Sequence, residues 1–196
     1  GERNFHILYE LVAGAAKSGL AKELQLEGVE AYRVLSASGC TELEDVDDAV
    51  QFEGVRTACK TIGLDKETQM QVWKTLAAVL HMSNLAFDGK DDSQGEVATV
   101  RDSAALTRLS ALLGVDAPLV ESMLTQRTVK TLGEVFTKKL EVQDANLTRD
   151  AIVKSLYEAL FLWIVRIINT SLGKGAESLP FIGVLDIFGE FRYSVG

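Results

Sequence analysis

The chain has 196 residues, of which 47% are hydrophobic and 24% are charged, as expected of one folded domain or one piece of a larger domain. Its formal net charge of −8 argues against a general nucleic-acid-binding protein, because such proteins need clustered Lys and Arg to displace counterions. The two cysteines are in no metal-ligand or redox spacing, and there is no signal peptide or transmembrane run. We therefore expect a cytoplasmic protein with no membrane contact from this segment.

The first third of the chain is predicted to be helical. Apolar residues at helical spacing predict a helix over residues 4–19, and a turn-rich stretch follows at 27–40. The acidic run at 41–48 is interpreted as the solvated start of a second helix, since acidic side chains favour a helix N-terminus. We expect that helix to end near Gly63 and to pack through four apolar positions, Val46, Val50, Val55 and Ala58.

The middle of the chain is predicted to combine helices with a short hairpin. A strong helix follows Asp65, its expected cap, and carries an apolar stripe formed by Met70, Trp73, Leu76, Ala77 and Leu80. A polar stretch at 88–97 contains turn signals and predicts the loop of a hairpin. Two shorter helices are expected near residues 102–113 and 116–126, each starting at an aspartate that can cap it.

The last third is expected to hold a second hairpin, a long helix and a buried strand. β-branched residues and lysines around Gly133 predict a β-hairpin over 127–142. Residues 144–175 predict the longest helix, with an apolar stripe so wide that most of its circumference should be buried. The continuous apolar run at 179–188 predicts a strand of a central sheet, covered on both faces. Such a strand needs neighbours, and the chain supplies few. We therefore expect a mainly α chain with a partial β-sheet, belonging to a larger α/β domain.

The end of this strand is a candidate nucleotide site. In nucleotide hydrolases of the P-loop class, a buried strand ends in an aspartate near Mg²⁺, and a glycine three residues later directs its N–H at the γ-phosphate. Asp186 and Gly189 fit this arrangement, although a strand followed by an ordinary turn would give the same letters. The phosphate-binding sequence G-x-x-x-x-G-K-[ST] is absent, and the nearest candidates, at 173–174 and 14–19, fail its spacing.

Four segments resemble the motor domain of myosins. The start, GERNFHILYEL (1–11), is similar to the stretch that follows switch I in that family. VWKTLAAVLHMSNLAF (72–87) and RDAIVKSLYEALFLWIVRIINTSL (149–172) are similar to two of the family's helices, and FIGVLDIFG (181–189) resembles its switch II strand and loop. The four segments occur in family order and at family-like distances, over nearly the whole chain to Gly189.

The resemblance implies a fragment of a P-loop NTPase-type motor domain at residues 1–189, in the upper actin-binding subdomain, from just after switch I through switch II. It implies that Asp186, Ile187, Phe188 and Gly189 contact the nucleotide, with Asp186 holding a water of the Mg²⁺ ion. ATP and Mg²⁺ are implied for the complete motor. None is expected bound to this chain alone, which we expect not to hydrolyse ATP without a phosphate loop and switch I.

The resemblance also assigns the hairpin at 127–140 to a loop through which myosins contact the actin filament. The residues implied are Arg127, Lys130, Gly133, Glu134, Lys138 and Lys139. Glu134 lies sixteen residues before Asp150, at the family's acidic-or-phosphorylatable position, so actin coupling is expected to need no kinase. The alternative is an exposed hairpin glutamate with no such role. The expected partners are the actin filament and the remainder of the motor, in the cytoplasmic cytoskeleton.

Residues 190–196 depart from the family pattern. Where the family has DIFGFE this chain has DIFGEF, so Phe191 stands where the family's glutamate pairs with a switch I arginine, and Glu190 comes one residue early. We therefore expect a non-family tail after Gly189. The departure favours an alternative function, a noncatalytic myosin-like interaction module that has lost motor activity. A small GTPase-like switch protein fits less well, because the chain has no base-specificity motif.

Overall fold

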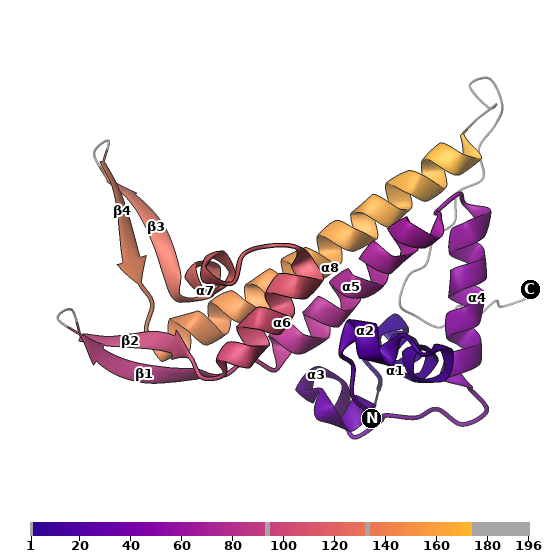
Figure 1. Cartoon of the computed structure of the whole chain (residues 1–196), viewed down its shortest axis with the longest axis horizontal. Coiled ribbons are helices and arrows are strands. Elements are labelled where there is room, and N and C mark those ends of the chain that lie inside the picture. The colour runs from indigo at the N-terminus through magenta and orange to yellow at the C-terminus, as the bar shows by residue number, and fades with distance from the viewer. Residues whose placement is uncertain (1, 93–94, 132–133, 174–196) are drawn as a thin grey trace, which may run out of the picture.

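A computed structural model describes residues 2–92, 95–131 and 134–173 as mainly helical, with two small antiparallel sheets (Figure 1). In chain order its elements are α1 (His6–Ser18), α2 (Ala21–Leu24), η1 (Val29–Ala31), α3 (Arg33–Ser36), α4 (Asp48–Thr61), α5 (Lys66–Ser83), β1 (Phe87–Asp92), β2 (Gly95–Val100), α6 (Ser103–Leu113), α7 (Ala117–Thr125), β3 (Gln126–Thr131), β4 (Glu134–Lys139) and α8 (Val142–Leu172). The mainly helical class is confirmed, and the apolar run at 179–188, with the partial central sheet that it predicts, lies outside the described residues.

The long helices α5 and α8 form the spine of the fold (Figure 1). They run side by side, with the two hairpins at one end and α1 and α4 at the other. Each hairpin is a separate two-stranded sheet, β1 with β2 and β3 with β4. The polar stretch predicted as a hairpin loop at 88–97 therefore belongs largely to the strands themselves.

Aspartate caps fix where several helices begin. Asp65 and Asp102 accept backbone N–H groups at 2.8 and 2.9 Å, as predicted for α5 and α6. Asp116 precedes α7 but makes no capping hydrogen bond. Asp47 caps α4 by accepting two N–H groups, at 2.9 and 3.1 Å. Helix α4 thus starts at Asp48, and most of the acidic run that we assigned to the helix start precedes the helix.

The predicted packing face of α4 is wrong in its first half. Val46 and Val50 are exposed, the latter by 55%, whereas Phe52 is fully buried together with Ala49 and Cys59. The Phe52 ring lies 4.9 Å from the Trp73 ring of α5, centroid to centroid. Burying an aromatic ring stabilises more than burying a valine, so Phe52 sets which side of α4 faces the core.

The core holds one histidine and one cysteine, two residue types that often carry chemistry. His81 is buried on α5 with its Nε2 3.2 Å from the Leu24 carbonyl oxygen, and burial lowers its pKa, which keeps the ring neutral. Cys59 is buried as well, and burial raises the pKa of its thiol, which keeps it protonated and unreactive. Both side chains therefore act as packing groups.

Helix α8 is less buried than its apolar width predicts. Only Ala145 and Arg149 are fully buried, while Phe161 is 57% exposed. One side packs against α5, and residues of α1, α4, α5 and α8 line an apolar hollow of about 410 Å³ that includes Trp73 and Phe161. The prediction of burial around most of the circumference is wrong for the described residues, because α8 packs mainly along this one side.

Candidate protein interface on two hairpins

The predicted nucleotide residues lie beyond the part of the chain that the structure describes. Asp186, Ile187, Phe188 and Gly189 fall in the undescribed range 174–196, and so does the predicted tail. Gly133 of the predicted actin-binding set is likewise outside the described residues. Glu134 is placed through its backbone, at the start of β4 and opposite Thr131. The candidate site within the described residues is therefore the hairpin pair.

The described residues offer few other functional features. Across 2–92, 95–131 and 134–173, no three His, Cys, Asp or Glu side chains gather as a metal site would require. In the same ranges no individual helix has the length and apolar character to cross a membrane, although the bent pair α6–α7 meets the criteria jointly. What the structure presents instead is surface on two projecting hairpins.

The β3–β4 hairpin pairs two cations and two apolar residues on one face. Its antiparallel register places Arg127 opposite Lys138 and Val129 opposite Phe136. Directly opposite residues share a face, and alternate pairs along a hairpin share it too. We call these four residues the basic–apolar face. The predicted residues Lys130 and Lys139 lie on the other face, opposite Val135 and Gln126.

The basic–apolar face is energetically unfavourable while it is exposed to water. Arg127 and Lys138 are both exposed, and like charges opposite each other destabilise a sheet. Phe136 is 53% exposed beside them, although burying an aromatic ring is strongly favourable. Exposed apolar side chains bordered by cations are typical of a surface that binds an acidic protein partner.

The base of this hairpin is held by the first hairpin. Leu140, directly after β4, is buried, and its N–H donates to the Thr125 carbonyl oxygen at 2.8 Å. The Leu140 carbonyl oxygen accepts the N–H of Ala98 in β2 at 2.7 Å. Lys139 adds an ion pair to Asp92 of β1, with Nζ 2.8 Å from Oδ2. A single hairpin is only marginally stable in water. These contacts at its base therefore give β3–β4 a defined position.

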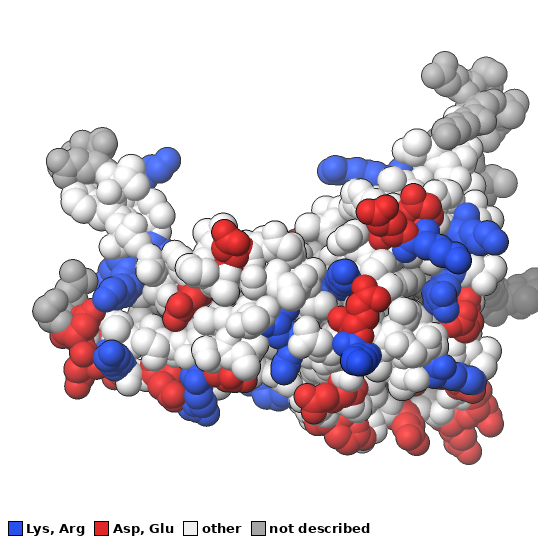
Figure 2. Space-filling view, in the orientation of Figure 1, with Lys and Arg blue, Asp and Glu red and all other residues white. Residues whose placement is uncertain are grey.

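The β1–β2 hairpin has the opposite electrostatic character. Figure 2 shows acidic side chains over this hairpin, whereas the β3–β4 hairpin shows basic and uncharged surface. Asp88 is paired with Arg101, whose Nε and Nη2 both lie within 2.9 Å of Oδ1, and Asp92 is paired with Lys139. The first hairpin is therefore a poor surface for an acidic partner, except where its carboxylates are neutralised.

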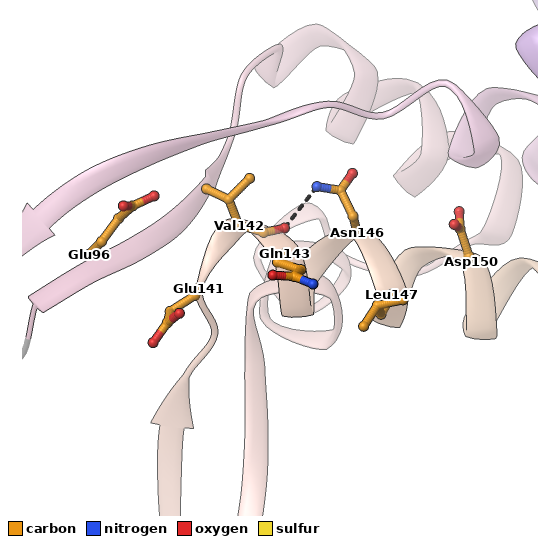
Figure 3. Close-up of a pocket in the computed structure, with 7 residues that line it drawn as sticks. All are labelled: Glu96, Glu141, Val142, Gln143, Asn146, Leu147 and Asp150. Carbon is orange, nitrogen blue, oxygen red and sulfur yellow. Dashed lines mark hydrogen bonds between the residues drawn. The ribbon is translucent and has the colours of Figure 1, made fainter.

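A hollow of about 550 Å³ lies between β2 and the start of α8 (Figure 3). Three carboxylates line it, those of Glu96, Glu141 and Asp150. Asn146 Nδ2 donates to the Val142 carbonyl oxygen at 2.8 Å, so this amide is used within α8 (Figure 3). Three carboxylates repel a phosphate group, and the hollow is therefore unsuited to a nucleotide.

Arg149 anchors α8 below the hairpins. Its buried guanidinium donates to the Leu85 carbonyl oxygen at 2.6 Å, to Asn146 Oδ1 at 2.8 Å and to Asp150 Oδ1 at 2.9 Å. Leu85 lies between α5 and β1, so one side chain joins both long helices to the first hairpin. Neither this residue nor the Lys139–Asp92 pair could be found from the sequence, because local spacing does not reveal partners 64 and 47 residues away.

The sequence is similar to known proteins along almost its whole length. The family described as myosin head (motor domain) matches residues 1–194. The chain is 40% identical to the myosin-I heavy chain of Dictyostelium discoideum over 189 residues, which is 96% of this chain and 8% of that protein. It is 35% identical to the non-muscle myosin-2 heavy chain of Acanthamoeba castellanii and 34% identical to the myosin IE heavy chain of Dictyostelium discoideum, covering 96% of this chain in both cases.

The chain is much shorter than these relatives. It spans 12% of the Acanthamoeba protein and 19% of the myosin IE heavy chain. The family match nevertheless runs through almost all of its residues, including the two hairpins and α8. The chain therefore belongs to the myosin head (motor domain) family.

Proposed function

We propose that this chain is a segment of an ATP-driven cytoskeletal motor and that its β3–β4 hairpin contacts the actin filament. Membership of the motor-domain family supports the motor, and the basic–apolar face is the observation that supports the contact. Actin presents an acidic surface, so Arg127 and Lys138 attract it over long range. Phe136 and Val129 add apolar contact once the surfaces meet.

The nucleotide part of the proposal concerns residues 186–189. In a P-loop NTPase-type motor domain, Asp186 would hold a water of the Mg²⁺ ion, and the Gly189 N–H would face the γ-phosphate of ATP. Loss of the γ-phosphate would release the loop, and this motion would be transmitted to the actin-binding region. The support for these roles is the family membership together with the sequence FIGVLDIFG.

The proposed contact is tested by reversing the two charges of the basic–apolar face. In a complete motor carrying this segment, the double variant R127E/K138E is expected to raise the half-saturating actin concentration about tenfold, because both cations face acidic actin. Its activity without actin should stay unchanged. The measurement is actin-activated ATPase at two salt concentrations, and the variant should also show a weaker salt dependence.

The matched control is R56E/K60E, which makes the same change in net charge on α4. Figure 1 shows α4 at the end of the fold opposite the hairpins. This control should leave the half-saturating actin concentration within twofold of the wild type. An equal loss in both double variants would show a general charge effect and would reject a contact at the β3–β4 hairpin.

Glu134 is proposed to supply a permanent negative charge at the family's acidic-or-phosphorylatable position. Its backbone begins β4, opposite Thr131 at the end of β3. In the complete motor, Glu134→Ala is expected to reduce actin activation of the ATPase several-fold, while Glu134→Asp keeps the charge and most of the activation. Unchanged activation in Glu134→Ala would leave Glu134 as an ordinary surface residue.

The second candidate function is a noncatalytic myosin-like interaction module. Phe191, at the position of the family's switch II glutamate, is the observation that favours it. The two candidates share the hairpin contact but differ in nucleotide turnover. Actin-activated Mg-ATPase in the complete protein would support the motor, and actin binding without turnover would support the module.

A further inference from the structure

Two adjacent lysines in β4 have different surroundings. Lys138 lies opposite Arg127 on the basic–apolar face, whereas Lys139 lies opposite Gln126 on the other face. Lys139 Nζ is 2.8 Å from Asp92 Oδ2, and the two side chains are 53% and 23% exposed. The Lys139 charge is therefore already paired within the molecule, whereas Lys138 lies opposite another cation, Arg127.

The Lys139–Asp92 pair holds the two hairpins at a second point. The first point is the backbone bond from Ala98 N–H to the Leu140 carbonyl oxygen, at 2.7 Å. Asp92 pairs with Gly95 at the far end of β1–β2, three residues from Ala98. That is about 10 Å along the strand. The contacts of Leu140 act at one point, and a second attachment at this distance restrains rotation of the hairpins about that point.

We propose that Lys139 is a positioning residue, which fixes the angle between the two hairpins and so aims the basic–apolar face at the partner. The functional consequence of this restraint rests on the proposed actin contact, whereas the restraint itself does not. The ion pair is partly exposed, and such pairs contribute little to global stability. Its effect is therefore expected in hairpin geometry and partner binding rather than in the unfolding of the protein.

Losing Lys139 would act on partner binding in two ways. The basic–apolar face would sample a wider range of angles, which lowers the fraction of molecules ready to bind. The positive charge of Lys139 would also be lost beside the Asp92 carboxylate, which makes this part of the surface more negative where an acidic partner approaches. Losing Lys138 removes a contact charge and leaves the angle between the hairpins unchanged.

The restraint is tested without actin, by hydrogen exchange of the complete motor. The reporter is the amide of Ala98, which makes the backbone bond between the two hairpins, and the amide of Leu140, which bonds to Thr125 at the base of β3–β4, serves as an internal reference. In Lys139→Met the Ala98 amide is expected to exchange about three- to tenfold faster, and Lys139→Arg should keep the wild-type rate. Lys138→Met is the matched control, with the same chemical change on the opposite face and no expected change in exchange. Equal exchange rates in both methionine variants would overturn the proposal.

Measuring actin binding together with hydrogen exchange then distinguishes the role of Lys138 from that of Lys139. Lys138→Met should raise the half-saturating actin concentration several-fold with unaltered exchange, and Lys139→Met should change both quantities. Exchanging the charges, in K139D/D92K, should restore part of the protection that Lys139→Asp alone removes. A failure of the wild-type motor to bind actin would reject the proposed function but leave the exchange experiment valid. Normal exchange in Lys139→Met would reject the positioning role even if actin binds.

Discussion

Replacing Gly14 by alanine is expected to lower the free energy of unfolding by about 2 kcal/mol, although this change stabilises an ordinary helix. A Cβ atom at Gly14 would lie 2.1 Å from Phe52 Cδ1, 2.4 Å from Cγ and 2.5 Å from Cβ. Phe52 is fully buried and packs on Trp73, so its ring cannot move aside without disturbing α5. Overpacking of this kind outweighs the gain in helix propensity of about 1 kcal/mol.

The control for this experiment is the same substitution at Gly54. Gly54 lies within α4, and a Cβ there would meet nothing within 4 Å. Gly54→Ala is therefore expected to stabilise the protein by about 1 kcal/mol, through helix propensity alone. Urea unfolding measures both variants. The two substitutions are expected to change the free energy of unfolding in opposite directions. Destabilisation of similar size in both variants would contradict the close approach of α1 to α4.

Replacing Arg149 by methionine is expected to destabilise the protein by about 3 kcal/mol, because a buried guanidinium makes charged hydrogen bonds that methionine cannot replace. The Leu85 carbonyl oxygen would lose a donor that now lies 2.6 Å away, and Asn146 Oδ1 would lose one at 2.8 Å. Methionine fills much of the same space, so the loss reports on hydrogen bonding more than on packing.

Two further variants sharpen the Arg149 test. Arg149→Lys keeps the charge but loses the fork of donors, so its stability should fall between the wild type and Arg149→Met. Arg101→Met breaks the exposed pair with Asp88, 2.8 Å apart, and should change stability little, because such pairs are screened by water. If chemical denaturation showed equal losses at Arg149 and Arg101, Arg149 would not be the anchor of α8.

Features that depend on a short stretch of sequence were predictable. The caps at Asp65 and Asp102 need only a side chain beside its own helix, and both form. The hairpin around Gly133 follows from a turn signal between extended runs, and β3 and β4 pair there. The family assignment also came from local strings of residues, and the match over residues 1–194 confirms it.

Features that depend on distant partners were not predictable. The packing face of α4 is set by Phe52 against Trp73 of another helix, so counting the spacing of valines selected the wrong side. The width of the apolar stripe on α8 showed that the helix could be buried, but not how much of it is covered in this chain. The position of the second hairpin depends on the backbone hydrogen bond between Ala98 and Leu140, which no local sequence pattern predicts.

The most direct test of the proposed actin contact is site-specific photo-crosslinking from the hairpin itself. Phe136 and Thr137 are adjacent and both exposed, but Phe136 lies on the basic–apolar face and Thr137 on the other. A benzophenone side chain is placed at each position in turn, in a complete motor mixed with actin filaments. If the basic–apolar face contacts actin, a covalent adduct with actin is expected from position 136 and little or none from position 137. Adducts from 137 alone, or from neither position, would contradict this contact.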